Sequence, residues 1–204
     1  MAENTRIIQR PTGKDEVVGA LLEAAADLFS NAGIEGVSVR EIAKRAGVNH
    51  GLVHRHFGSK EELARRVGDM LDDKIRDAVG SPRNLLDALD RASAATRDDS
   101  RIWRYIARLL VDGERGIMPE GHGNYLRALA SLASRDQERG ELSAGVDPRE
   151  LVFVLASLGL GMELFGDYLA SAIGLPKTDI HVLEDRFRDI FLAAFAVDES
   201  RQET

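Results

Sequence analysis

Cysteine is absent from this chain of 204 residues, which excludes disulfide bonds, thiol nucleophiles and thiolate metal sites. Aromatic residues are scarce at 5%, and tryptophan occurs only once. No run approaches about 18 uncharged apolar residues, so we expect no membrane span. The N-terminal sequence lacks the apolar core of a signal peptide. These absences predict a cytoplasmic protein without disulfides.

Charge is unevenly distributed along the chain. The net charge is −7, which taken alone argues against nucleic acid as a partner. Residues 40–60, however, contain five basic side chains and a single acidic one, Glu41. The sequence therefore places a small basic region on a larger acidic body, and for nucleic-acid binding the distribution matters more than the total.

Apolar residues recur at helical spacing along nearly the whole chain, and no segment alternates as a β-strand would. Ser38 and Glu41 have the spacing of a capping box, as do Ser59 and Glu62, and each pair predicts a helix start. Asp147, followed by a proline, predicts another. We therefore expect an all-α fold of about nine helices. The predicted helices span residues 14–31, 39–47, 50–57, 60–79, 84–96, 101–112, 122–139, 148–172 and 179–196, with a glycine-rich loop at 113–123.

Three of the five histidines lie in one stretch, "NHGLVHRHFGSK" at residues 49–60. On a helix, His50 and His54 would share a face, as two zinc ligands do. The glutamate of the H-E-x-x-H pattern is missing and no cysteine could complete the site, so we expect no metal. No catalytic triad or pair of carboxylates accompanies these residues, so we expect neither an enzyme nor a cofactor.

The region around this stretch has the spacing of a helix-turn-helix. Gly47 can adopt the backbone conformation of the tight turn between the helices predicted at 39–47 and 50–57. The small side chain of Ala43 lets the second helix approach closely. The start of that second helix would then lie nearest the base edges of DNA.

Residues 17–67 resemble the DNA-binding domain of TetR-family regulators. The family pattern is T/S-V-R-x-I-A-x-x-A-G-V-S-x-G-x-x-Y-x-H-F-x-x-K-x-x-L, and this chain reads "SVREIAKRAGVNHGLVHRHFGSKEEL". Two positions depart from it. Asn49 replaces the usual serine and is also a good helix cap. His54 replaces the usual tyrosine, a common phosphate contact.

The resemblance implies a division of the chain. It places a three-helix DNA-binding domain at 14–60, a linking helix at 60–79, and a helical effector-binding and dimerisation domain at 80–204. Residues 1–13 would be a disordered arm, with a minor-groove arm as the alternative. The residues assigned to DNA contact are Ser38, Arg40, Asn49, His50, Gly51, Leu52, His54, Arg55 and Lys60. His56 is instead expected to pack between helices, and for His50 and His54 a merely solvated face is the alternative.

The resemblance further implies a homodimer formed by the last two helices. Residues 150–175 are apolar on almost every side, which agrees with burial on more than one face. The expected interface residues are Leu155, Leu158, Gly159, Met162, Phe187, Ile190, Phe191 and Phe195. A monomer core is the alternative explanation of these residues.

Family members typically bind a small effector among their C-terminal helices. The candidate pocket residues here are Trp103, Tyr105, Ile106, Leu110, Leu126, Leu129, Phe153, Met162, Phe165 and Tyr168. An apolar or amphipathic molecule is the expected effector, although such residues at helical spacing also form ordinary cores.

The sequence thus predicts a homodimeric repressor that binds a palindromic double-stranded operator and is released by an effector. The alternatives are an activator or a ligand-blind regulator on the same fold. An alternative of another class is a helical interaction module, or an enzyme, that does not bind DNA.

Overall fold

The computed structural model describes residues 11–118, 123–175 and 180–195. Within these residues the chain forms nine α-helices, one short 3-10 helix and no β-strand, so the predicted all-α fold is confirmed. The α-helices are α1 (Lys14–Ala32), α2 (Val39–Ala46), α3 (Gly51–Phe57), α4 (Lys60–Val79), α5 (Leu85–Asp98), α6 (Arg101–Val111), α7 (Asn124–Glu138), α8 (Pro148–Ala172) and α9 (Ile180–Phe195).

Three sequence predictions need comment at their boundaries. Most of the arm predicted at 1–13 lies outside the described residues, as does residue 122, where the seventh helix was expected to begin. The segment predicted as a loop at 113–123 contains the 3-10 helix η1 (Arg115–Ile117), in which Ile117 is buried. This segment is therefore attached to the core at least at one point.

Helix starts follow the capping chemistry of the sequence. Ser38 Oγ accepts from the N–H of Glu41 at 3.2 Å, and the Glu41 carboxylate accepts from the N–H of Ser38 at 2.8 Å. Both halves of this capping box are thus present. Ser59 accepts from the N–H of Glu62 at 3.0 Å, and Asp147 caps α8. Each of these contacts satisfies an N–H that the first helical turn leaves without an internal partner.

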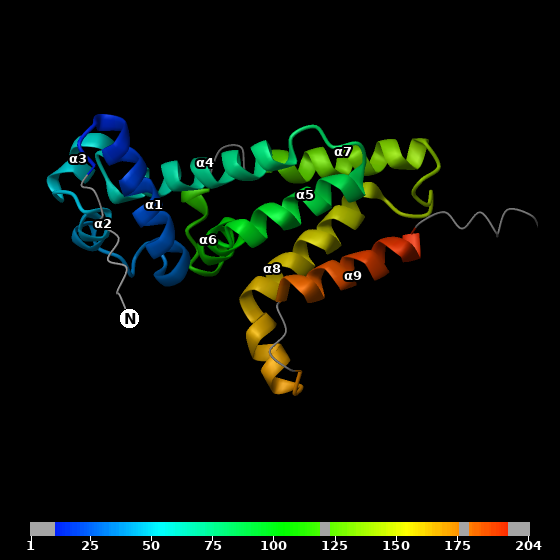
Figure 1. Ribbon diagram of the computed structural model, residues 1–204. Coiled ribbons are helices and arrows are strands. Elements are labelled where there is room, and N and C mark those ends of the chain that lie inside the picture. The colour runs from blue at the N-terminus through cyan, green and yellow to red at the C-terminus, as the bar shows by residue number, and fades with distance from the viewer. Residues whose placement is uncertain (1–10, 119–122, 176–179, 196–204) are drawn as a thin grey trace, which may run out of the picture.

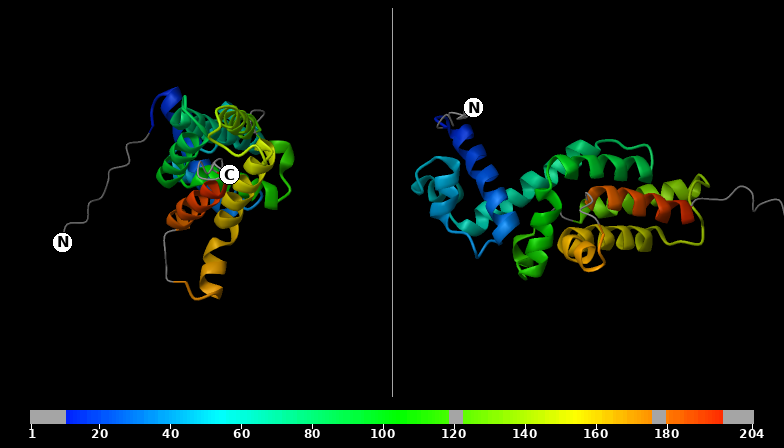
Figure 2. Two further views of the ribbon diagram at one scale, coloured as in Figure 1. Left: turned by 90° about the vertical axis from the view of Figure 1, so that its right-hand side faces the viewer. Right: turned by 60° about the horizontal axis from the view of Figure 1, so that its bottom comes forward.

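The helices form two groups joined by α4 (Figure 1). Helices α1–α3 lie together at one end of an elongated molecule, and α5, α7, α8 and α9 lie at the other, as the right-hand view of Figure 2 also shows. Helix α6 packs against α1, α4 and α8. Buried side chains of α1, α4 and α6 belong to one continuous core. Helices α4 and α6 therefore connect the two groups.

Helix α8 changes direction about halfway along, and its C-terminal half projects from the rest of the chain (Figure 1). By length and mean hydropathy it could cross a membrane, and it is the one such helix among the described residues. Length and hydropathy alone do not distinguish a membrane-spanning helix from an apolar helix that packs within a protein. Glu163, near the middle of α8, is paired with Arg104 of α6 at 2.8 Å. This ion pair ties α8 to the protein body.

Candidate DNA interface and effector cavity

The turn between α2 and α3 has the predicted geometry. Gly47 ends α2 with φ 71° and ψ 24°, and its N–H donates to the carbonyl of Lys44 at 3.2 Å. A residue with a Cβ rarely adopts this left-handed conformation, so glycine suits the turn. Ile42 and Ala43 of α2 and Val53 of α3 are buried in the core. The helix-turn-helix is thus held together from its inner side by small and apolar residues.

The outer face of α3 is free for a large partner. The N-cap residue of α3 is His50, and its side chain makes no cap bond. Asn49, predicted as a cap, lies one residue earlier, and its Oδ1 accepts from the N–H of Gly51 at 2.8 Å. His50, His54 and Arg55 are exposed. Helix α3 lies at the end of the molecule remote from α8 and α9 (Figure 1). The side chains expected to read base edges therefore lie on an open surface.

His54 makes a contact that limits how it could replace the family's tyrosine. Its Nδ1 lies 3.1 Å from the carbonyl oxygen of Gly58. Since a carbonyl only accepts, this nitrogen carries the hydrogen. In a neutral ring, Nε2 would then carry no hydrogen and could only accept a hydrogen bond. A phosphate oxygen is also an acceptor, so the two would not bond. His54 can donate to a phosphate only when the ring is protonated on both nitrogens.

Lys60 has a role that the sequence did not indicate. Its Nζ donates to the carbonyl oxygens of Ile34 at 2.9 Å and Val37 at 3.3 Å, and lies 3.9 Å from the Glu35 carboxylate. The side chain is only 20% exposed. Lys60 therefore fastens the start of α4 to the loop between α1 and α2. The predicted phosphate contact remains a prediction, and it would compete with these acceptors.

The other residues assigned to DNA contact differ in exposure. Arg40 is exposed on α2. Ser38 is also exposed, but its hydroxyl donates to the Glu41 carboxylate at 2.7 Å. Leu52 is half-buried and packs against the core. His56, which was not assigned to DNA contact but expected to pack between helices, is half-buried. Arg40 is thus the most accessible of these for a backbone phosphate.

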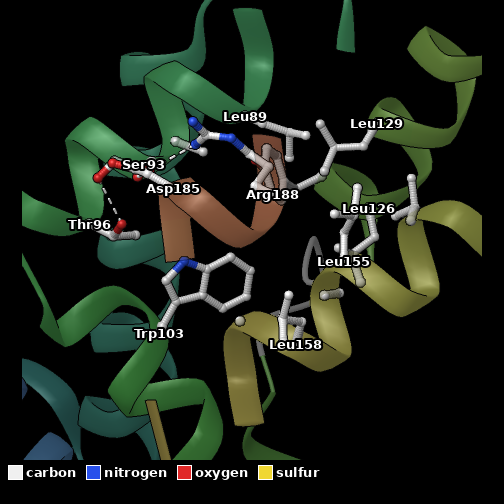
Figure 3. Close-up of a pocket in the computed structure, with 15 residues that line it drawn as sticks. Leu89, Ser93, Thr96, Trp103, Leu126, Leu129, Leu155, Leu158, Asp185 and Arg188 are labelled. Carbon is white, nitrogen blue, oxygen red and sulfur yellow. Dashed lines mark hydrogen bonds and ion pairs between the residues drawn. The ribbon is translucent and has the colours of Figure 1, made fainter. Parts of the chain in front are cut away.

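A cavity of about 110 Å³ lies among α5, α6, α7, α8 and α9 (Figure 3). Of the ten residues proposed for the effector pocket, Trp103, Leu126 and Leu129 line it. Three residues assigned to the dimer interface, Leu155, Leu158 and Gly159, also line it. The sequence did not single out the remaining wall residues, which are Leu89, Ala92, Ser93, Thr96, Tyr125, Val152, Ala156, Asp185 and Arg188.

The seven other residues proposed for the pocket lie elsewhere. Tyr105 is 1% exposed and faces α4, where its hydroxyl donates to the carbonyl of Ala64 at 2.6 Å. Ile106 lines a separate small space beside α4, and Met162 is half-buried outside the cavity wall. The remaining four are exposed on the protein surface, namely Leu110, Phe153, Phe165 and Tyr168. Residue type and spacing selected these side chains, but neither indicates which side of an apolar helix faces a cavity.

The cavity has one polar side, formed by α5 and α9. Ser93 donates to Asp185 Oδ1 at 2.8 Å, and Thr96 donates to the carbonyl of Ser93 at 3.0 Å. Arg188 Nη1 bonds Asp185 Oδ1 at 2.9 Å. Figure 3 shows Trp103 and Leu158 across the cavity from this group. The wall thus combines a large apolar surface with one hydrogen-bonded group, as small-molecule sites commonly do.

The surface of α8 and α9 carries large apolar side chains with no cover within the described chain. Phe153 is 72% exposed and Tyr168 73% exposed on α8, and Phe187 and Ile190 are exposed on α9. Phe187 and Ile190 were assigned to the dimer interface. The side chains of Phe191 and Phe195 lie outside the described part of the chain. Several large apolar side chains exposed on neighbouring helices are typical of a site of association.

An ion cluster links α1, α4 and the start of α6. Arg101, at the start of α6, bonds Asp99 at 2.6 Å, Asp27 at 2.8 Å and Glu23 at 2.8 Å, and Lys74 of α4 bonds Asp99 at 3.0 Å. The Arg101 guanidinium, with Lys74, lowers the pKa of Asp99 to about 2 despite its partial burial. The cluster therefore couples α1 of the first group to α4 and α6.

Comparison with known proteins agrees with this geometry. Residues 21–67 match the bacterial regulatory proteins of the tetR family. Over 171 residues the chain is 36% identical to the HTH-type transcriptional repressor Rv3405c of Mycobacterium tuberculosis, covering 82% of each chain. It is 29% identical over 150 residues to the A-factor receptor protein of Streptomyces griseus, covering 72% of this chain and 54% of that protein.

Solved structures show the same architecture. One, from work on the control of antibiotic production by bacterial hormones, has a TM-score of 0.71 and 25% identity, and covers 91% of this chain and 100% of its own. The ketosteroid transcriptional regulator KstR2 of Mycobacterium tuberculosis has the same fold at 19% identity, with a TM-score of 0.63, and covers 92% of this chain and 98% of its own. The chain therefore belongs to the TetR family of bacterial transcriptional regulators.

Proposed function

We propose that this protein is a homodimeric transcriptional repressor that binds a palindromic operator and releases it when a small molecule occupies the cavity among α5–α9. The observation that carries the proposal is the exposed outer face of α3 on a helix-turn-helix that matches the family. Similarity to a repressor over 82% of the chain supports repression. Such a protein would act on DNA in the cytoplasm, and no enzymatic role is proposed.

DNA recognition is divided between two kinds of contact. His50 and Asn49, at the start of α3, would approach base edges in the major groove, where sequence is read. Arg40 and Arg55 are exposed and would neutralise phosphates without reading sequence. Gly51 would allow the backbone to approach the DNA closely. The net charge of −7 does not oppose this assignment, because phosphates would meet only the basic region.

The homodimer would form through the exposed apolar surface of α8 and α9. Operators with twofold symmetry are read by twofold dimers, so two copies of α3 would be held at a defined distance. Phe153, Phe165 and Tyr168, proposed from the sequence for the effector pocket, fit this interface better because they are exposed. Burying them against a second copy would remove a large apolar area from water.

The effector would bind in the cavity beside Trp103. The A-factor receptor and a solved γ-butyrolactone receptor are named for small ligands, which supports a ligand-responsive role here. To release DNA, an effector must bind one arrangement of the dimer more tightly than the other. Helices α4 and α6 connect the cavity region to α1–α3 and would carry that difference.

A mobility shift with the DNA upstream of the protein's own gene tests the proposal. We expect specific binding that unrelated DNA at equal concentration does not compete away. Absence of specific binding would favour the helical interaction module or the enzyme. Specific binding combined with increased transcription would identify an activator. DNA binding that no cellular extract releases would favour the ligand-blind regulator.

A further inference from the structure

The charged side chains in the cavity wall are already satisfied by one another. Asp185 and Arg188 are the only charged residues that line the cavity. Arg188 bonds Asp185 at 2.9 Å, Asp90 at 3.0 Å and Asp189 at 3.1 Å, and its side chain is only 15% exposed. The guanidinium therefore meets three carboxylates before any ligand arrives.

The charged side chains around Arg188 together hold no unmatched positive charge. Arg97 adds a second guanidinium, which bonds Asp185 Oδ2 at 2.7 Å. Three carboxylates and two guanidinium groups leave a formal excess of one negative charge. An anionic ligand beside Arg188 would also lie beside Asp185. A cationic ligand would find both oxygens of Asp185 occupied, by Ser93 and Arg188 on one and Arg97 on the other.

An ion of either sign would also lose its hydration against the apolar remainder of the wall. Transfer of a charge to such surroundings is costly unless a partner group is free to meet it. The leucines, alanines and Val152, which make up more than half of the wall residues, offer no such partner. The cavity therefore disfavours charged ligands on two independent grounds.

Two wall residues carry side-chain donors that bond no acceptor among the described residues, namely Tyr125 and Trp103. Ser93 and Thr96, by contrast, already donate to protein oxygens. Burial raises the pKa of Tyr125 well above its usual range, so the phenol keeps its hydrogen. This half-buried hydroxyl can therefore donate to an acceptor oxygen that a ligand brings.

We propose that the cavity selects uncharged ligands that carry an acceptor oxygen, such as a ketone or ester, that Tyr125 donates to this oxygen, and that Asp185 excludes anions. This proposal rests on the proposed role of the cavity as the effector site and names the chemical class of the effector. Ligand charge is thus decided by the pairing between α5 and α9, and ligand orientation by α7.

The single tryptophan allows a direct test, because Trp103 lies in the cavity wall and its fluorescence responds to an occupant. Methyl octanoate and octanoate share a chain and a carbonyl but differ in charge near neutral pH. We expect the full-length protein to bind the ester at least about tenfold more tightly than the anion. Equal or tighter binding of octanoate or octylammonium, or no saturable response to the ester, would overturn the proposal.

Two substitutions separate the roles within the wall. Tyr125→Phe should weaken ester binding about fivefold, the value of one hydrogen bond, and leave DNA binding unchanged. Asp185→Asn keeps an acceptor for Ser93 and should strengthen octanoate binding about tenfold without affecting the ester. Asp189 also pairs with Arg188, but it lies outside the cavity and its side chain is 63% exposed. Asp189→Asn removes one carboxylate charge, as Asp185→Asn does, and should change octanoate binding less than about twofold.

Equal effects of Asp185→Asn and Asp189→Asn would contradict the exclusion of anions by Asp185. An unchanged ester affinity in Tyr125→Phe would contradict its role as donor. A mobility shift on the same preparations separates these failures from failure of the proposed function. A protein that binds its operator but prefers anions refutes only the ligand class, whereas one that binds no DNA refutes the regulatory role.

Discussion

At the scale of the residue, Lys60 shows how one side chain can serve stability in a DNA-binding region. Its ammonium group donates to the carbonyl oxygens of Ile34 and Val37 in the loop between α1 and α2. The Ile34 carbonyl also accepts from the N–H of Val37 at 3.2 Å. When no DNA is bound, Lys60, the lysine of the family motif, thus stabilises the fold. Any phosphate contact would have to be made in addition to these bonds or at their expense.

Lys60→Ala should therefore lower the free energy of unfolding by about 1–3 kcal/mol, because two carbonyls lose a charged donor. Urea unfolding measures this change. Lys44→Ala, an exposed lysine on α2, is the matched control and should have little effect on stability. If Lys60→Ala weakened DNA binding but left stability unchanged, its bonds to the loop would be unimportant and the phosphate contact would account for its role.

His50 and Arg55 test the division of DNA contacts on α3. His50→Ala should relax preference at one or two operator positions, at a cost of about 1–3 kcal/mol on the preferred base. Arg55→Ala should weaken binding to all sequences and reduce the slope of affinity against salt by about one unit. Mobility shifts on the operator and on random DNA at several salt concentrations distinguish the two. Equal losses on both DNAs for both variants would refute the assignment.

At the scale of the element, the ion cluster at the start of α6 has a predictable pH dependence. Asp99 has its pKa lowered to about 2 from 3.8, so in the folded state it stays ionised where the unfolded chain would take up a proton. Its contribution of about 2 kcal/mol is fully present above about pH 4 and is lost as the pH falls towards about 2. Acid should thus loosen α6 from α1 and α4.

Asp99→Asn should remove most of this contribution. We expect the stability of the variant and the parent protein to differ by about 2 kcal/mol near pH 6, and the difference to shrink below about pH 3. Urea unfolding at each pH measures it. Asp98→Asn, an exposed neighbour on α5, controls for general loss of a carboxylate. A difference that stayed constant with pH would show that the ionised form of Asp99 is not what stabilises the fold.

At the scale of the whole molecule, the apolar surface of α8 and α9 has a predictable role in assembly. Tyr168→Asp places a charge where the proposed interface would bury it, so the dimer should dissociate at micromolar concentration. Light scattering with size-exclusion chromatography measures the mass. Leu86→Asp, at an exposed apolar position on α5, should remain dimeric. A Tyr168→Asp protein of unchanged mass would place the interface elsewhere.

Effector binding in the cavity and operator binding by the same protein should affect each other. Leu129 is buried in the cavity wall, and Leu129→Trp should fill the space, abolish the effector response and leave the dimer and operator binding intact. The response is the loss of mobility shift when effector is added. Because coupling is reciprocal, operator DNA should weaken effector binding by the same factor in the parent protein. Equal effector affinity with and without operator would exclude the switch.

Much of the helix-turn-helix could be predicted from the amino-acid sequence alone. Ser38, Gly47 and Asn49 act on backbone groups within a few residues of themselves, so capping and turn chemistry are local and readable in sequence order. The helix boundaries could be predicted from the sequence for the same reason. The family motif combines these local requirements, which is why a short region was enough to recognise it.

The cavity and the exposed surface depended on the tertiary structure. Helix α8 is apolar on nearly all sides, so its sequence gives no phase that distinguishes Leu155, in the cavity wall, from Phe153, on the surface. The ion pairs Arg188–Asp90 and Arg97–Asp185 join α9 to α5, two helices that lie far apart in the chain. Local chemistry determined where the helices begin and end, and long-range packing decided which side chains a ligand or a second copy can reach.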